Sequence, residues 1–186
     1  WLIKNVEDSG VKLTGSPGTV KMREAILAHD KTVIAEALAA LGESALGKKW
    51  YIFEGQTQPD VYIETDDLIV VIEGKRTEFG PTNETRWMKV RSQMLRHIDC
   101  AWDKRGSKRV TGFYIVEGKD DSGEVPEDWV SHAKKTVSKE MLEASLPHRI
   151  EAKECEQIAS CFIGVTTWQV ICREFGIKWP PVEVMV

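Results

Sequence analysis

Hydrophobic positions along this chain follow helical spacing in some segments and strand spacing in others. Apolar residues that recur every three or four positions predict helices, and short runs rich in β-branched residues predict strands. The predicted helices cover about residues 19–41, 84–104, 127–145 and 150–175, and the predicted strands cover 49–53, 61–65, 68–73 and 109–116. This order of elements indicates an α/β fold in which helices cover both faces of a mixed sheet.

Two of the predicted strands form a hairpin that places chemically interesting residues opposite one another. If the chain turns on Asp66 and Asp67, residue 61 pairs with residue 72, and Asp60 lies across from Glu73. Directly opposite residues have Cβ atoms roughly 4.5–5.5 Å apart on one sheet face. Lys75 lies two residues beyond Glu73 and projects to that same face.

The other face of this hairpin is expected to be the apolar face that fixes its register. Its residues are Val61, Ile63, Leu68, Val70 and Ile72.

Two carboxylates at such a distance repel each other unless they share a proton or a cation. Hard oxygen ligands suit Mg²⁺ with several retained waters, and a lysine beside them could orient or deprotonate one of these waters. Asp60, Glu73 and Lys75 therefore predict a site for phosphodiester hydrolysis. The alternative for these residues is a hairpin with a charged rim and one ion pair.

Pro59, Asp60, Glu73 and Lys75 together resemble the motif of the PD-(D/E)xK nuclease superfamily, whose fold is called restriction-endonuclease-like. The resemblance implies an αβββαβ core over about residues 19–117, within a single nuclease-like domain (1–186) that has a helical C-terminal extension over about 118–186. It also implies Asp60 and Glu73 as ligands of Mg²⁺, for which Mn²⁺ would substitute. Lys75 would position the attacking water or stabilise the charged phosphorane.

The predicted helix over 84–104 carries a polar seam beside its apolar stripe. The residues of this seam are Arg86, Lys89, Gln93, Arg96 and His97. Gln93 and His97 are similar to the QxxxY element of RecB-like nucleases, with His97 in place of the tyrosine. This resemblance implies that Gln93 lies near the metal and belongs to the catalytic residues; a solvated helix flank is the alternative.

An acid from the first helix often joins the site in this family, and three residues compete for that position. They are Glu24, Asp30 and Glu36, and the sequence does not choose among them. Glu36 would lie on the far side of the helix unless the helix breaks near His29 and Asp30.

The charge of the chain limits how it could bind nucleic acid. Lys and Arg number 25 against 29 Asp and Glu, a formal charge of −4 on 186 residues, which argues against coating of nucleic acid by bulk charge. Local basic pairs could still touch a phosphate backbone, and they occur at 104–105, 108–109 and 134–135. The apolar runs are too short to span a membrane, and we expect an intracellular, cytoplasmic protein.

These observations predict a metal-dependent endonuclease or exonuclease that hydrolyses DNA through Asp60, Glu73, Lys75 and Gln93. One alternative is a catalytically idle module that keeps the same fold and grips DNA without cutting. Another is a protein-interaction domain that uses the helices after Glu127. A symmetric homodimer would suit cutting of both strands, but the sequence leaves the oligomeric state open. It also leaves open which DNA sequence is recognised and whether the protein has a restriction, repair or mobile-element role.

Overall fold

The computed structural model of the chain describes residue 13 and residues 16–41, 58–85, 88–149 and 151–179. The chain divides into two compact units, one containing residues 1–56 and 85–89 and the other residues 57–84 and 90–186. The single domain and the core over 19–117 remain predictions. Within the described residues, no helix has the length and apolar character needed to cross a membrane.

The described helices of the first unit are α2 (Pro17–Leu27) and α3 (Lys31–Leu41). The prediction of one helix over 19–41 is therefore wrong, because the chain breaks at His29, whose φ is +57°. Asp30 starts α3 by accepting hydrogen bonds from the backbone N–H groups of Thr32 (2.9 Å) and Val33 (3.1 Å). A short acidic side chain is a favoured N-cap, and here it restarts the helix in a new direction.

The second unit contains four strands and five helices among its described residues. The strands are β1 (Val61–Glu64), β2 (Leu68–Lys75), β3 (Arg109–Val116) and β4 (Phe162–Thr167). The helices are α4 (Gln93–Lys104), α5 (Glu127–Thr136), α6 (Lys139–Ser145), α7 (Ala152–Ser160) and α8 (Trp168–Glu174).

The strands form one mixed sheet in the order β1-β2-β3-β4. The hairpin prediction is confirmed, because β1 and β2 are antiparallel and Val61 pairs with Ile72. Strand β3 is parallel to β2, and β4 is parallel to β3. The prediction of a strand over 109–116 is also confirmed, whereas the predicted strand over 49–53 lies outside the described residues. The fold is thus α/β, with a four-stranded mixed sheet flanked by helices.

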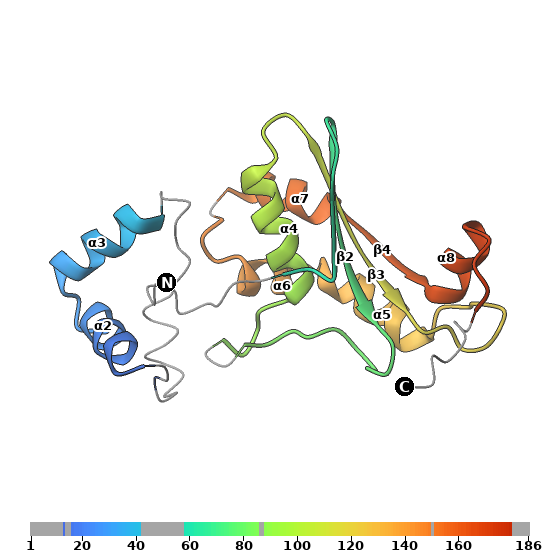
Figure 1. Cartoon of the computed structure of the whole chain (residues 1–186), viewed down its shortest axis with the longest axis horizontal. Coiled ribbons are helices and arrows are strands. Elements are labelled where there is room, and N and C mark those ends of the chain that lie inside the picture. The colour runs from blue at the N-terminus through green and yellow to red at the C-terminus, as the bar shows by residue number, and fades with distance from the viewer. Residues whose placement is uncertain (1–12, 14–15, 42–57, 86–87, 150, 180–186) are drawn as a thin grey trace. The chain divides into compact units, whose positions relative to one another are not determined.

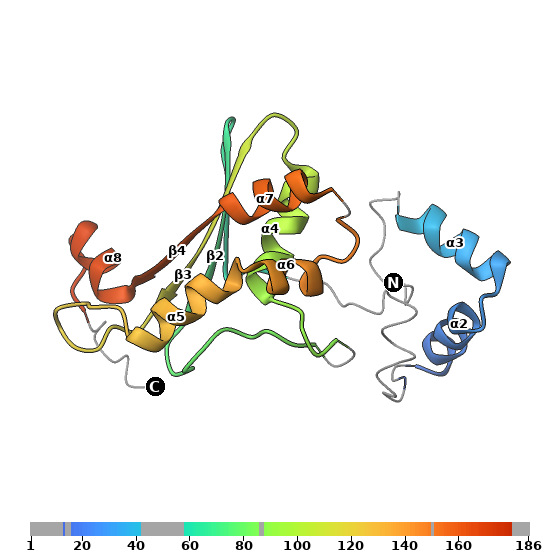
Figure 2. The same cartoon turned by 180° about the vertical axis from the view of Figure 1, so that it is seen from behind.

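Helices α4 to α7 contribute to one core against one face of this sheet (Figures 1 and 2). Ile69 and Val71 of β2 are completely buried beneath α4, while Val61 and Ile63 on the opposite face of the hairpin are 39 % and 47 % exposed. The apolar face was therefore predicted on the wrong side. The amphipathic helix α4 packs on the side that carries Glu73, so this side forms the core.

Helix α4 begins later than predicted, at Gln93 instead of near residue 84. The backbone N–H groups of Arg91 and Gln93 donate to the carbonyls of Asn83 (2.7 Å) and Thr82 (2.9 Å). The Ser92 side chain caps the helix by accepting from Leu95 N–H. These bonds hold the preceding segment outside the helix, so Lys89 is not on a helical seam with Gln93; Arg86 lies outside the described residues.

The C-terminal part corrects a second prediction, because the stretch over 150–175 is not continuously helical. Strand β4 interrupts it between α7 and α8. Gly164 has a φ of +112°, which no helix contains, and the neighbouring β-branched residues favour a strand. The stretch over 127–145 is helical as predicted, in two helices separated by the Ser138 N-cap.

Gly112 lets α4 approach β3 closely, since a Cβ at this position would lie 2.7 Å from Ile98 Cδ1 and 3.0 Å from Met94 Sδ. We expect Gly112→Ala to destabilise the protein by about 1–3 kcal/mol through overpacking. Urea unfolding of Gly112→Ala, Ile98→Val and the double variant measures this. Ile98→Val removes Cδ1, one of the two Ile98 atoms that lie 2.7 Å from the added Cβ, so the double variant should lose less stability than the two single losses added together. Simple additivity would contradict the steric explanation.

Candidate active site

The centre of the site is the Glu73 carboxylate, near the end of β2. Glu73 follows Ile69 and Val71 at alternate positions, so it points from the same sheet face toward α4. Only 2 % of this residue is exposed. A buried carboxylate is costly unless it is paired and hydrogen-bonded, and Glu73 has two hydrogen bonds at Oε1 and a histidine next to Oε2.

Three side chains from two elements contact this carboxylate. Lys75 Nζ lies 3.0 Å from Glu73 Oε1, and Gln93 Nε2 donates to the same oxygen at 2.6 Å. Gln93 Oε1 in turn accepts from Lys75 Nζ at 3.4 Å. On the other side, His97 Nε2 lies 3.2 Å from Glu73 Oε2. The structure therefore brings together Glu73, Lys75, Gln93 and His97, which we call the Glu73 cluster.

The cluster keeps Glu73 ionised. Burial alone would raise the pKa of this carboxyl, but the hydrogen bonds and charges of His97 and Lys75 outweigh burial and hold the pKa below its usual value. An ionised carboxylate is the form that binds a cation, so the cluster favours the state that a metal site requires.

Asp60 lies just before β1 and is exposed. The described pairing of β1 with β2 begins at Val61 and Ile72, so Asp60 lies one residue before it and the pairing of Asp60 with Glu73 stays a prediction. Its Oδ2 accepts a hydrogen bond of 2.8 Å from the Gly74 N–H, so this carboxylate is anchored to the backbone of β2 beside the Glu73 cluster.

Trp168 of α8 is a neighbour that the sequence did not reveal. A Cβ on Gly74 would lie 2.8 Å from the Trp168 ring and 3.5 Å from Asp60 Oδ2. Trp168 Nε1 donates to the Lys75 carbonyl at 3.4 Å. The indole therefore covers β2 beside Asp60. No sequence signal identifies it, because the predicted helix over 150–175 hid the strand that positions it.

Four of the remaining predicted residues belong to the first unit. Glu24, Asp30 and Glu36 belong to the first unit, where Asp30 serves as the N-cap of α3. Lys89 also belongs to that unit, and Arg96 is half-buried on α4. The choice among the three acids stays open.

The donor chemistry of Asp60 and Glu73 fits magnesium better than a transition metal. Among the described residues, no group of three His, Cys, Asp or Glu side chains forms a metal-binding cluster. Magnesium needs fewer protein ligands, because it commonly binds through one or two carboxylates and keeps several waters. Asp60 is exposed and accepts from the backbone N–H next to Glu73, so these two carboxylates are the candidates for this smaller requirement.

No protein-family model matches this sequence, and no curated protein or solved structure matches it either. Any assignment narrower than an α/β fold therefore rests on the chemistry of the Glu73 cluster and Asp60.

Proposed function

We propose that this protein is a Mg²⁺-dependent deoxyribonuclease with a restriction-endonuclease-like fold. One observation carries the proposal: Glu73, Lys75 and Gln93 are in direct contact at the end of β2, beside the hairpin position of Asp60. A carboxylate pair with an adjacent ammonium group is the arrangement that metal-assisted phosphodiester hydrolysis uses.

Asp60 and Glu73 would hold the cation, which would supply Lewis acidity and lower the pKa of bound water. Gln93 fixes the orientation of the Glu73 carboxylate through its 2.6 Å hydrogen bond. Lys75 Nζ lies between Glu73 Oε1 and Gln93 Oε1, so its position is set by two acceptors. From this position the ammonium orients the attacking water or stabilises negative charge that develops on the phosphate.

A second candidate follows from the burial of the same cluster. The Lys75 side chain is 10 % exposed and that of Glu73 is 3 % exposed. Lys75, Gln93 and His97 all contact the Glu73 carboxylate. A closed ion pair of this kind supports folding without any ligand. It favours a catalytically idle DNA-binding or protein-interaction module as the competing function.

We expect the purified chain to degrade DNA with Mg²⁺ or Mn²⁺ and to be inactive in EDTA, because the proposed chemistry needs the cation. The measurement incubates supercoiled plasmid, linear duplex and single-stranded DNA under each condition and resolves the products on gels. Plasmid nicking or linearisation would indicate endonuclease action, and degradation of linear DNA alone would indicate exonuclease action. Absence of cleavage with every substrate and metal would contradict the proposal and favour the idle module.

A further inference from the structure

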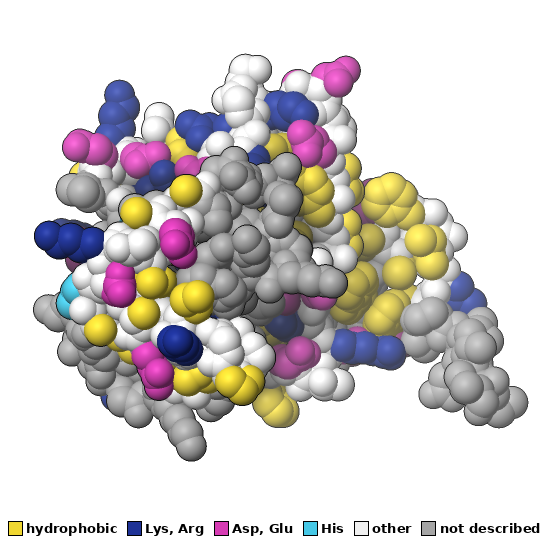
Figure 3. All heavy atoms as spheres, turned by 60° about the vertical axis from the view of Figure 1, so that its left-hand side comes forward, with side chains coloured by type: hydrophobic (Ala, Val, Ile, Leu, Met, Phe, Trp, Pro, Cys, Tyr) yellow, Lys and Arg dark blue, Asp and Glu magenta, His cyan; other side chains and the backbone are white. Residues whose placement is uncertain are grey.

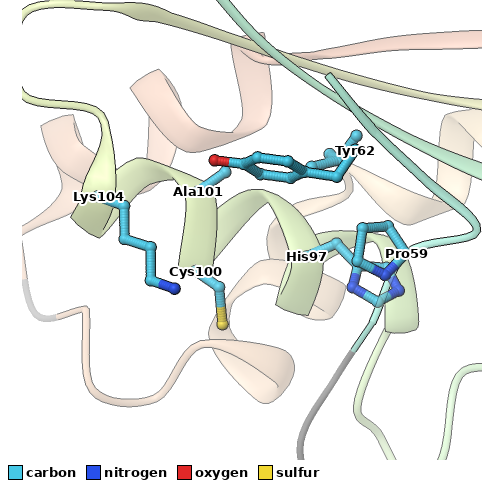
Figure 4. Close-up of a pocket in the computed structure, with 7 residues that line it drawn as sticks. Pro59, Tyr62, His97, Cys100, Ala101 and Lys104 are labelled. Atoms are coloured by element: carbon cyan, nitrogen blue, oxygen red, sulfur yellow. The ribbon is translucent and has the colours of Figure 1, made fainter. Parts of the chain in front are cut away.

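A pocket of about 110 Å³ opens between β1 and α4, next to the Glu73 cluster. Pro59, Val71 and Ala101 provide apolar surface, and Tyr62 adds an aromatic ring. Figure 4 shows this ring across from α4, with Pro59 and His97 toward one end of the pocket and Cys100 and Lys104 toward the other. His97 also contacts Glu73, so one side chain belongs to both the pocket and the candidate active site.

Lys104 provides an available positive charge at this pocket. The basic residues that follow it have partners: Arg105 contacts Trp102, Lys108 Nζ lies 2.5 Å from Glu64, and Arg109 lies 3.5 Å from Asp67. Lys104 makes no hydrogen bond or ion pair with any described residue, and its charge also acts on the Glu64 carboxylate, which Lys108 pairs. An exposed ammonium group at the rim of a pocket attracts an anion such as a phosphate.

The Tyr62 ring is both accessible and held in place. The residue is 46 % exposed, and its hydroxyl donates to Glu64 Oε2 at 2.8 Å. Lys108 binds the other oxygen of Glu64 and offsets its charge. A ring fixed at its hydroxyl end can receive a planar group without losing further freedom, which is the preorganisation that favours binding.

On the face shown in Figure 3, Lys and Arg side chains are interspersed with Asp and Glu side chains. A nucleic-acid contact on that face would depend on individual side chains and not on a large area of one charge.

We propose that this pocket binds one unpaired nucleotide of a DNA strand, with its base on the Tyr62 ring and a phosphate at Lys104. Aromatic rings bind unpaired bases of any sequence, and lysine binds the backbone phosphate without reading sequence. The proposal deepens the proposed function and rests on it, since it makes single-stranded DNA the substrate form held beside Asp60 and Glu73.

The test measures binding separately from cleavage. A fluorescein-labelled oligo(dT) of eight nucleotides is titrated with the full chain in EDTA, and anisotropy reports the Kd. We expect Tyr62→Ala and Lys104→Ala each to weaken binding about tenfold. Tyr62→Phe keeps the ring and loses only the hydroxyl bond to Glu64, so it should weaken binding much less than Tyr62→Ala. Lys104→Ala should also reduce the slope of log Kd against log salt concentration by about one, the value expected for the loss of one phosphate contact.

Lys139→Ala on α6 is the matched control, because it removes the same charge from an exposed lysine that does not line the pocket. It should leave Kd nearly unchanged. Equal weakening by Lys139→Ala, unchanged binding by Tyr62→Ala and Lys104→Ala, or no binding by the parent protein would each overturn the proposal. Binding that depends on Tyr62 without any cleavage in Mg²⁺ would instead overturn the nuclease and leave the pocket in place.

Discussion

Asp60→Asn is expected to lower Mg²⁺-dependent DNA cleavage about a thousandfold while leaving the fold intact. Loss of one of two carboxylate ligands weakens the cation site, and Lewis-acid stabilisation worth several kcal/mol corresponds to about three orders of magnitude in rate. The amide oxygen of asparagine can still accept the hydrogen bond from Gly74 N–H, so the local structure should survive. Initial cleavage rates and the thermal unfolding midpoint test both statements.

Asp66→Asn is the control for this experiment, since it removes the same charge from an exposed residue at the turn of the same hairpin. Its cleavage rate should match that of the parent protein. Full activity in Asp60→Asn would remove Asp60 from the mechanism. An equal loss in both variants would attribute the effect to net charge instead of metal binding.

Lys75→Met is expected to destabilise the protein by about 3 kcal/mol, as well as to abolish cleavage. Removing one partner of a buried ion pair leaves an uncompensated charge, which costs about 3–5 kcal/mol. We place Lys75→Met at the lower end, because Gln93 and His97 still contact Glu73. Urea unfolding monitored by tryptophan fluorescence gives the change. Because Lys75→Met is expected to lose stability as well as activity, its cleavage rate must be compared with its fraction of folded protein. Asp60→Asn is expected to keep the fold, so its cleavage rate can be read directly.

The pH dependence identifies the cause of this loss. In the parent protein the folded pKa of Glu73 is lowered, so its stabilising contribution is present above the unfolded pKa of about 4.3 and is lost as the pH falls through the folded value. In Lys75→Met, the lysine no longer opposes the effect of burial on the pKa of Glu73, so this pKa is higher than in the parent protein. Protonation of Glu73 then removes the unpaired charge. The stability difference between the two proteins should therefore shrink as the pH is lowered from 7 toward 4.

The control is Lys119→Met, which breaks an exposed pair with Glu124. Exposed pairs contribute little, so its unfolding midpoint should stay close to that of the parent protein at every pH. A difference for Lys75→Met that does not change with pH would attribute the loss to packing of the lysine stem instead of to the charge of Glu73.

The hairpin could be predicted because its information is local. Asp66 and Asp67 separate two β-branched runs, and this spacing alone sets the pairing of Val61 with Ile72. The core side of the hairpin was not predictable in the same way. It depends on where α4 packs, and the position of α4 depends in turn on bonds between distant backbone groups at residues 82–83 and 91–93.

The candidate site shows the same division between local and distant information. The spacing of Glu73 and Lys75 on one strand placed them together, and Gln93 was assigned to the site by its resemblance to a nuclease motif. The depth of Glu73 and the position of Trp168 could not be predicted, because burial and the start of α8 are set by the packing of β4 and the helices around it.

Glu73 and Gln93 belong to elements on either side of a long connection, since β2 leads through α4 before the chain returns to β3. The Glu73 cluster consequently requires the helix to be docked on the strands. A change that undocks α4 would separate Gln93 and His97 from Glu73 even where the hairpin stays paired.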